Sequence, residues 1–275
     1  MQEGAMIQMA DLTRQGMDGF RQAGERLAAW RAEVARRAAL ARQPQPEGAR
    51  PPSVRRLLAE LGSPAELWRE AGKVRRAGGL ELPRGTSRAV MLVPGFGAHP
   101  MRMRGLARAL EGAGHRVSDW GMGWNLGADE DRFARLCERV DAMARKEREP
   151  LTLVGWSLGG LYAREVAKIM PENVAMVVTM GTPFSGDRRA NNAWRAYQAV
   201  TGHTVDHPPV GEDLAEKPPV LTVALWSPRD GIVAPRSACG WPGERDRAIA
   251  VRCTHLGFAG HPDVTRAVAA LLTEG

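Results

Sequence analysis

The chain has 275 residues, of which 44% are hydrophobic, so it is long enough to enclose one large core. No apolar run approaches the 18 or more residues of a membrane-spanning helix, and the first residues lack the basic and apolar regions of a signal peptide. Its three cysteines, Cys137, Cys239 and Cys253, lack metal-binding spacing. We therefore expect a cytoplasmic protein with reduced thiols.

The net charge of +7 is unevenly distributed along the chain. Residues 1–89 hold 16 Lys and Arg against 10 Asp and Glu, whereas residues 90–275 hold 22 against 21. Because the basic residues alternate with acidic ones and no recognition motif occurs, we do not expect a nucleic-acid partner. The sequence has no phosphate-binding glycine loop and no cluster of metal ligands, so it implies no cofactor and no metal.

Residues 1–85 are predicted to form an N-terminal helical extension. The start of the chain has a set of mostly apolar residues at helical spacing, and the opposite faces of this predicted helix are rich in arginine. The set is Met6, Met9, Thr13, Met17, Phe20, Leu27, Trp30, Val34 and Ala38. Such a helix can lie on an anionic membrane surface or pack on a partner chain. It can also be a loosely ordered leader, since three of these methionines are alternative initiators, and we favour this third hypothesis.

A second pair of helices is predicted after a linker at residues 43–52, which is rich in Pro and Gln. Leu57, Leu58 and Leu61 indicate the first helix of this pair. The segment 63–66 (SPAE) has the form of a capping box and predicts the start of the second.

Residues 86–275 alternate between short apolar runs and helical patterns, which predicts a mostly parallel sheet with helices on both faces. The predicted strands are 89–93, 116–120, 151–154, 174–180, 220–226 and 248–254. The predicted helices are 101–112, 129–148, 158–170 and 262–273. In such folds, ligands bind at the carboxyl ends of the strands.

The third apolar run leads directly into the pentapeptide 155–159 (GWSLG), which has the form G-x-S-x-G. A serine that attacks an acyl carbon must stand clear of its backbone on a sharp strand-to-helix turn, and flanking glycines allow that turn. The helix predicted after it would favour a developing oxyanion at its N-terminus. By itself the pentapeptide also occurs by chance in loops, so its context decides its meaning.

This combination of motif, strand order and later acidic and basic residues resembles the α/β-hydrolase superfamily, in particular its bacterial lipases and esterases. The resemblance covers residues 86–275. Members of that superfamily carry their triad in the order serine, acid, histidine, and the chain offers Ser157, Asp230 and His255 in that order. The resemblance thus implies these three as catalytic residues.

Both later residues have alternatives. Asp230 follows the fifth strand-like run, where the superfamily carries its acid, but Asp230-Gly231 can also be an ordinary turn. His255 ends the last strand-like run, whereas His261 precedes Pro262 at the start of the final predicted helix. We favour Asp230 and His255 on position.

The resemblance also implies two backbone donors for an oxyanion, the N–H groups of Leu158 and Phe96. Phe96 lies in the loop after the first strand, where many lipases have His-Gly and this chain has Pro94-Gly95. A backbone donor survives that change. The alternative is a simple turn that ends the strand.

Two further segments are predicted to border the site. The glycine-rich segment 121–127 contains Trp124 and Asn125, which would line the cleft or merely belong to a packed connection. Residues 182–218 are long for a connection and predict a small cap, in which Trp194 would contact an acyl chain or anchor the cap. Other candidate substrate-binding residues are Gly95 and Trp156.

The sequence therefore predicts a serine hydrolase that cleaves carboxylic esters through an acyl-enzyme, with a small-molecule or lipid-like acyl ester as substrate. Acyl transfer and thioester hydrolysis are the alternatives that use the same triad. A non-catalytic binding module with this fold is the alternative from another class. The basic helix at the N-terminus adds peripheral membrane contact as a further prediction.

Overall fold

The computed structural model describes residues 2–127 and 129–274, with the backbone alone for residues 2–20. Its described part contains a six-stranded sheet in the order β2-β1-β3-β4-β5-β6, in which all neighbouring strands are parallel. The strands are β1 (Ala89–Val93), β2 (Arg116–Asp119), β3 (Leu151–Trp156), β4 (Val174–Met180), β5 (Leu221–Trp226) and β6 (Arg247–Ala250). The predicted parallel sheet is confirmed.

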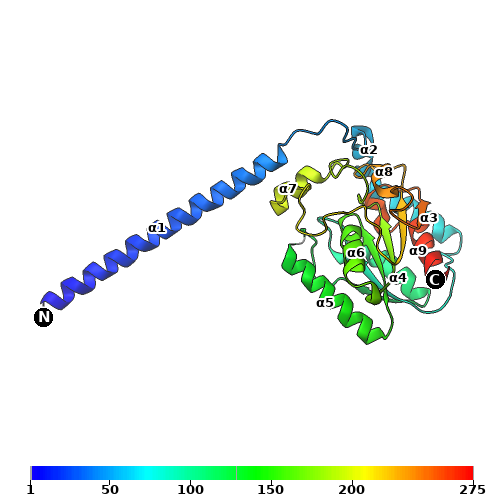
Figure 1. Cartoon of the computed structure of the whole chain (residues 1–275), viewed down its shortest axis with the longest axis horizontal. Coiled ribbons are helices and arrows are strands. Elements are labelled where there is room, and N and C mark those ends of the chain that lie inside the picture. The colour runs from blue at the N-terminus through cyan, green and yellow to red at the C-terminus, as the bar shows by residue number, and fades with distance from the viewer. Residues whose placement is uncertain (1, 128, 275) are drawn as a thin grey trace.

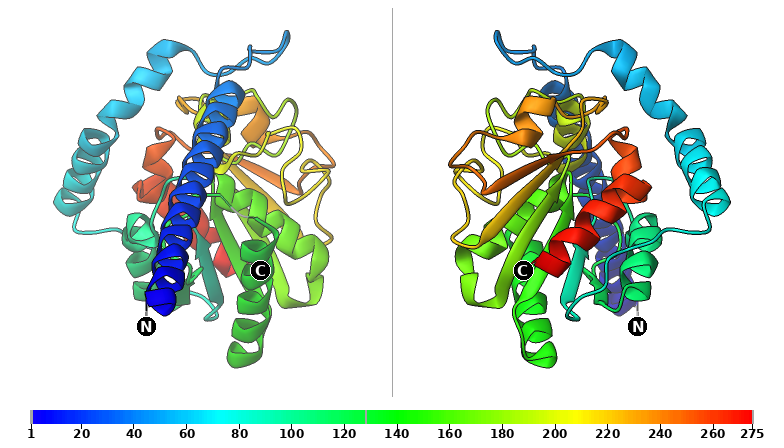
Figure 2. Two further views of the ribbon diagram at one scale, coloured as in Figure 1. Left: turned by 90° about the vertical axis from the view of Figure 1, so that its left-hand side faces the viewer. Right: turned by 90° about the vertical axis from the view of Figure 1, so that its right-hand side faces the viewer.

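Helices cover both faces of this sheet, as the two side views show (Figure 2). Side chains alternate along β1: Val90 and Leu92 join the core beneath α4 (Arg104–Gly112) and α9 (Pro262–Glu274), and Met91 joins the opposite core. The opposite face is covered by α5 (Glu130–Glu147) and α6 (Leu158–Ile169). Shorter helices are η2 (Pro100–Met103), η3 (Pro171–Asn173), α8 (Pro235–Cys239) and η4 (Leu256–Ala259).

The last strand is shorter than the sequence predicts. β6 ends at Ala250, and the predicted extension to Thr254 is wrong. After Val251 donates to the carbonyl of Trp226, the chain leaves the sheet, and the Ser227 hydroxyl then donates to the carbonyl of Cys253. The segment before His255 is therefore held by a hydrogen bond from the loop after β5 instead of by strand pairing.

The N-terminal extension begins with α1 (Gln2–Ala41), a single long helix that leads away from the sheet (Figure 1). The predicted helix is confirmed, although the predicted pattern from Met6 to Phe20 lies outside the side chains that the structure describes. The C-terminal end of α1 packs on α7 (Trp194–Thr201): Arg37 donates to the carbonyl of Val200 at 2.5 Å. Within the described residues, no helix combines the length and apolar character needed to cross a bilayer.

The predicted second helix pair is present as α2 (Val54–Ala59), η1 (Glu60–Gly62) and α3 (Ser63–Arg76). The predicted capping box is wrong, because Gly62 occupies the N-cap and no side chain caps α3. The Ser63 hydroxyl instead lies 2.7 Å from the hydroxyl of Thr254, and Glu66 accepts hydrogen bonds from that same residue. The two side chains thus serve contacts with the far end of the chain.

The insertion predicted at 182–218 contains α7 and otherwise irregular chain. It is tied to the N-terminal extension by side chains of both partners. Gln45 donates to the carbonyl of Arg189 at 2.9 Å, and Gln198 donates to the carbonyl of Leu40 at 2.7 Å. The cap is therefore supported from outside the parallel sheet.

Candidate active site

Ser157 lies between β3 and α6 with φ 53° and ψ −120°. A positive φ is uncommon for a residue with a side chain and costs about 1–3 kcal/mol, so the surrounding structure must hold it. The flanking glycines allow this packing. A Cβ on Gly155 would overlap the carbonyl oxygen of Gly159, and one on Gly159 would overlap that of Val93.

The backbone of Ser157 is fixed at the carboxyl end of the sheet, where its N–H donates to the carbonyl of Met180 at 2.8 Å. Gly181, which follows Met180, donates its N–H to the carbonyl of Leu225 and so ties the ends of β4 and β5 together. The hydroxyl of Ser157 makes no hydrogen bond with the part of the chain that the structure describes. It is one of the side chains that line an apolar cavity.

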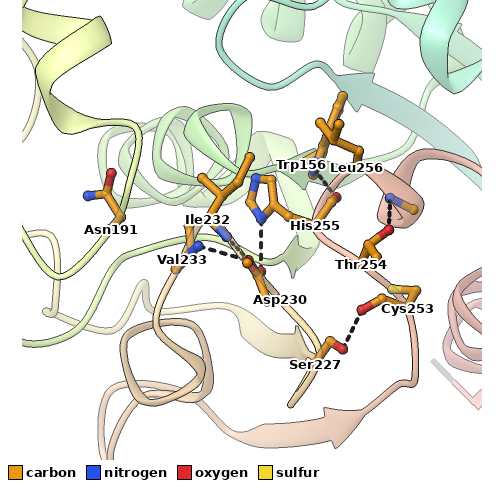
Figure 3. Close-up of polar contacts among 12 residues, drawn as sticks. Trp156, Asn191, Ser227, Asp230, Ile232, Val233, Cys253, Thr254, His255 and Leu256 are labelled. Carbon is orange, nitrogen blue, oxygen red and sulfur yellow. Dashed lines mark hydrogen bonds and ion pairs between the residues drawn. The ribbon is translucent and has the colours of Figure 1, made fainter. Parts of the chain in front are cut away.

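Asp230 and His255 form a buried pair, with 2.8 Å between Oδ2 of the carboxylate and Nδ1 of the imidazole (Figure 3). Their side chains are 0% and 3% exposed. The other carboxylate oxygen accepts hydrogen bonds from the N–H groups of Ile232 (2.9 Å) and Val233 (2.8 Å). These bonds orient Asp230 so that its second oxygen faces the ring, and they favour the tautomer in which Nδ1 carries the proton.

The pKa of His255 lies above its ordinary value. Burial disfavours the imidazolium and lowers this pKa, but the charge of Asp230, its hydrogen bond and the charge of Glu60 together raise it further. Proton uptake at His255 is therefore easier than its burial alone would allow.

The competing histidine, His261, lies at the start of α9 and is also buried. Its Nδ1 accepts a hydrogen bond from the N–H of Asp263 at 3.2 Å. The structure thus brings Asp230 to His255, whereas His261 serves the beginning of a helix.

Gly95 and Phe96 lie next to Ser157. A Cβ on Gly95 would lie 3.2 Å from the Cβ of Ser157, so only a residue without a side chain fits comfortably here. Phe96 and Leu158 line the same cavity as Ser157. Their N–H groups donate no hydrogen bond to a residue within the described ranges.

Asn125 holds the loop that contains Gly95 and Phe96. It is 0% exposed, its side-chain amide donates to the carbonyl of Pro94 at 2.7 Å, and its backbone pairs with Ala98. Asn125 does not line the cavity beside Ser157. The expected contact of Asn125 with substrate is therefore replaced by a supporting role, in which it holds the loop of Gly95 and Phe96.

The two tryptophans predicted near the serine lie outside this cavity. Trp124 is 58% exposed, packs edge-on against His99 and lines a separate hollow, to which Trp156 also contributes. The indole N–H of Trp156 donates to the carbonyl of His255 at 3.2 Å. Trp156 therefore supports the backbone of His255, and no contact of either tryptophan with the cavity beside Ser157 is found among the described side chains.

The cavity beside Ser157 is largely apolar. Its other lining residues are Leu161, Pro183, Arg188, Asn191, Ala193, Trp194, Tyr197, Val205, Pro208, Leu214 and Val233. Trp194 both lines the cavity and anchors the cap, since its indole N–H donates to Gln45 at 3.0 Å and its ring packs under Arg195. Tyr197 meets Phe96 edge-on at 5.5 Å between ring centroids, which joins α7 to the loop after β1.

No sequence pattern points to Glu60, and Glu66 is predicted only as part of a helix cap, yet the structure buries both beside the loops of Asp230 and His255. Both accept hydrogen bonds from backbone N–H groups more than 170 residues later in the chain. No local pattern signals such contacts. A glutamate on a short basic helix is usually a solvated residue.

Comparison with known families agrees with this architecture. A family profile described as alpha/beta hydrolase fold matches residues 88–207. The mature Bacillus licheniformis lipase BlEst2 superposes with a TM-score of 0.54 at 16% identity, over 70% of this chain and 95% of that one. This chain has the α/β-hydrolase fold.

Other solved structures resemble this chain to a similar degree. A structure from work on the metagenome-derived lipolytic enzymes LipS and LipT has a TM-score of 0.50 at 17% identity, over 71% of this chain and 97% of that one. A Paleococcus ferrophilus monoacylglycerol lipase has a TM-score of 0.49 at 20% identity, over 70% and 99%. No curated protein matches the chain. Among the described residues, no group of three or more His, Cys, Asp or Glu side chains is arranged to hold a metal.

Proposed function

We propose that this α/β-hydrolase cleaves carboxylic esters, with Ser157 as nucleophile, His255 as general base and Asp230 as the acid that orients the base. The observation that carries the proposal is the backbone of Ser157, a side-chain-bearing residue held at φ 53° between a strand and a helix. Strained residues of this kind occur where the surrounding fold presents a reactive group. The buried Asp230–His255 pair supports the same role assignment.

In the proposed first step, the hydroxyl oxygen of Ser157 attacks the ester carbonyl carbon while Nε2 of His255 accepts the hydroxyl proton. Asp230 stabilises the imidazolium that forms. The carbonyl oxygen becomes an oxyanion that the N–H groups of Phe96 and Leu158 stabilise. When the C–O bond breaks, His255 returns the proton to the leaving alcohol and the acyl group remains on Ser157.

Water completes the cycle by the same route. His255 accepts a proton from water as the oxygen attacks the acyl carbon, and it returns that proton to Ser157 when the carboxylic acid is released. The apolar cavity that begins at Ser157 favours an acyl or otherwise apolar group beside the reacting carbon.

Hydrolysis of p-nitrophenyl esters with acyl chains of increasing length tests the proposal. We expect turnover by the wild type, a kcat about 10³-fold or more lower for Ser157→Ala, and a dependence of kcat/KM on acyl length. A matched acyl thioester and an added alcohol acceptor are run in parallel. Turnover by Ser157→Ala at the wild-type rate would contradict the proposed nucleophile. Preferential cleavage of the thioester would make thioesters the substrate class, and preferential transfer to the alcohol would make the reaction acyl transfer.

A further inference from the structure

The loops that carry Asp230 and His255 are joined by a carboxylate that belongs to neither. Glu60 of η1 accepts hydrogen bonds at Oε1 from the N–H groups of Gly231 (2.8 Å) and His255 (2.7 Å). Its Oε2 accepts from the N–H of Leu256 at 2.9 Å. The side chain is 4% exposed, so these bonds form where water competes little. One carboxylate thus ties the residue after Asp230 to His255 itself.

Glu66 of α3 makes a second connection beside the first. It accepts from the N–H (3.1 Å) and the hydroxyl (2.6 Å) of Thr254, and it lies 3.6 Å from the guanidinium of Arg229. The residues that it contacts precede His255 and Asp230. The N-terminal extension therefore contacts the residues directly before and directly after both Asp230 and His255.

The charge of Glu60 is not neutralised by an ion pair with any residue that the structure describes. Two acidic groups contact His255: Asp230 at the imidazole Nδ1 and Glu60 at the backbone N–H. Glu66 lies beside the neighbouring Thr254 and is paired with Arg229. The charge of Glu60 is one of the causes that raise the pKa of His255. Glu60 can therefore act on this histidine through the backbone and through the electric field.

We propose that Glu60 is a positioning residue of the proposed reaction, which fixes the Asp230 loop against the His255 loop. This inference rests on the proposed function. The N-terminal extension then completes the site, although it contributes no group that touches the substrate. A misplacement of about 1 Å at a catalytic base lowers turnover by about 10²-fold, so modest loop movements matter.

Glu60→Gln is the first test, because it keeps the size of the side chain, removes its charge and replaces one acceptor oxygen by a donor that opposes the N–H of Leu256. We expect kcat on a short p-nitrophenyl ester to fall about 10- to 100-fold while KM changes by less than about threefold. The acid limb of the kcat/KM profile should move to lower pH. The matched control is Glu70→Gln on α3, whose carboxylate pairs with Lys73 and accepts no hydrogen bond from the described residues of the Asp230 and His255 loops, and whose variant should behave as wild type.

A second variant keeps Glu60 and separates the segments by a steric change. A Cβ on Gly231 would overlap the carbonyl oxygen of Arg56, so Gly231→Ala pushes α2 away from the Asp230 loop. We expect the same loss of kcat with KM little changed. This variant keeps the proposal testable if Glu60→Gln fails to fold, which circular dichroism of each variant detects.

Titration of the His255 imidazole by NMR tests the same inference without any substrate. We expect a lower pKa of His255 in Glu60→Gln than in wild type, and no change in Glu70→Gln. A lower melting temperature with unchanged kcat and unchanged His255 pKa would make Glu60 a purely structural residue and overturn the proposal. A folded wild type that hydrolyses no ester would overturn the proposed function, and the NMR titration still decides whether Glu60 acts on His255.

Discussion

The imidazole of His255 meets the carboxylate of Asp230 at 2.8 Å, and both side chains are almost fully buried. The two residues come from loops after different strands, β5 and β6, and are 25 positions apart in the chain. A buried carboxylate with one oxygen on two N–H groups and the other on an imidazole can hold that ring in one tautomer.

The first prediction concerns the proposed triad. Ser157→Ala, His255→Ala and Asp230→Asn should each lower kcat by about 10³- to 10⁶-fold and leave the circular dichroism spectrum unchanged, because each removes a group that acts in the transition state. Their effects should not add, since the three act as one unit. His261→Ala is the control. Near-normal turnover by His255→Ala together with an inactive His261→Ala would contradict the assigned base.

The second prediction concerns pH. Catalysis requires neutral His255, and the pKa of this residue lies above its ordinary value of 6.5. The acid limb of kcat/KM should therefore be centred above pH 6.5, and activity should be lost as the pH falls through it. Asp230→Asn should move the limb to lower pH, because it removes the charge and the hydrogen bond that raise the pKa. An acid limb centred below 6.5 in the wild type would contradict this prediction.

The same shift has a consequence for stability. A histidine whose pKa is raised on folding stabilises the native state when it is protonated. That contribution is present below the unfolded pKa and is lost as the pH rises through the folded pKa. Urea unfolding of wild type and His255→Gln between pH 5 and 9 measures it, and we expect the difference in their free energies of unfolding to shrink as the pH rises.

The third prediction concerns the loop after β1. Gly95→Val should lower kcat far more than it lowers the free energy of unfolding. The valine side chain would press on Ser157 and Trp156 and would move the N–H of Phe96 away from the proposed oxyanion position. Steady-state kinetics and urea unfolding of the same variant measure the two effects. Losses of equal size in kcat and stability would indicate a merely structural turn.

The fourth prediction concerns the N-terminal extension. A chain that begins at residue 43 should retain turnover of p-nitrophenyl acetate, because Glu60 and the Gln45 contact with Trp194 remain. A chain that begins at residue 80 should lose most of that turnover, since Glu60 and Glu66 are absent. Circular dichroism establishes that both chains fold. Equal activity of the two truncated chains would contradict the prediction.

The fifth prediction follows from the membrane hypothesis for α1. Trp30 is 63% exposed on this helix, and arginines lie along the same segment. If the helix binds anionic lipid, full-length protein should sediment with phosphatidylserine vesicles, and added salt or removal of residues 1–42 should weaken that binding. Binding that is absent or insensitive to salt would remove the hypothesis and leave a leader or a partner helix.

The order of the strands and helices could be predicted from the sequence because buried parallel strands are continuous apolar runs and the helices between them are amphipathic. The positive φ at Ser157 follows from the same kind of local signal, the two glycines that flank the turn. The order of residues in the resembling family predicts that Asp230 and His255 lie together, and the structure brings the two together.

Contacts between distant segments could not be predicted in this way. The sequence of Ser63 and Glu66 is typical of a helix cap, but tertiary partners at Thr254 compete for the same side chains. Asn125 looks like a cleft residue because it follows glycines after a strand, and only the fold shows that its amide supports Pro94. Glu60 carries no signal at all, since its distant partners are backbone N–H groups.

Fluorophosphonate labelling followed by peptide mass spectrometry tests the central claim most directly. The reagent modifies serines that a neighbouring base activates, so it reports the nucleophile without knowledge of the substrate. We expect one adduct on wild type, at Ser157, which is absent from Ser157→Ala and forms much more slowly on His255→Ala. A folded wild-type protein that stays unlabelled, or that is labelled at a different serine, would contradict the account.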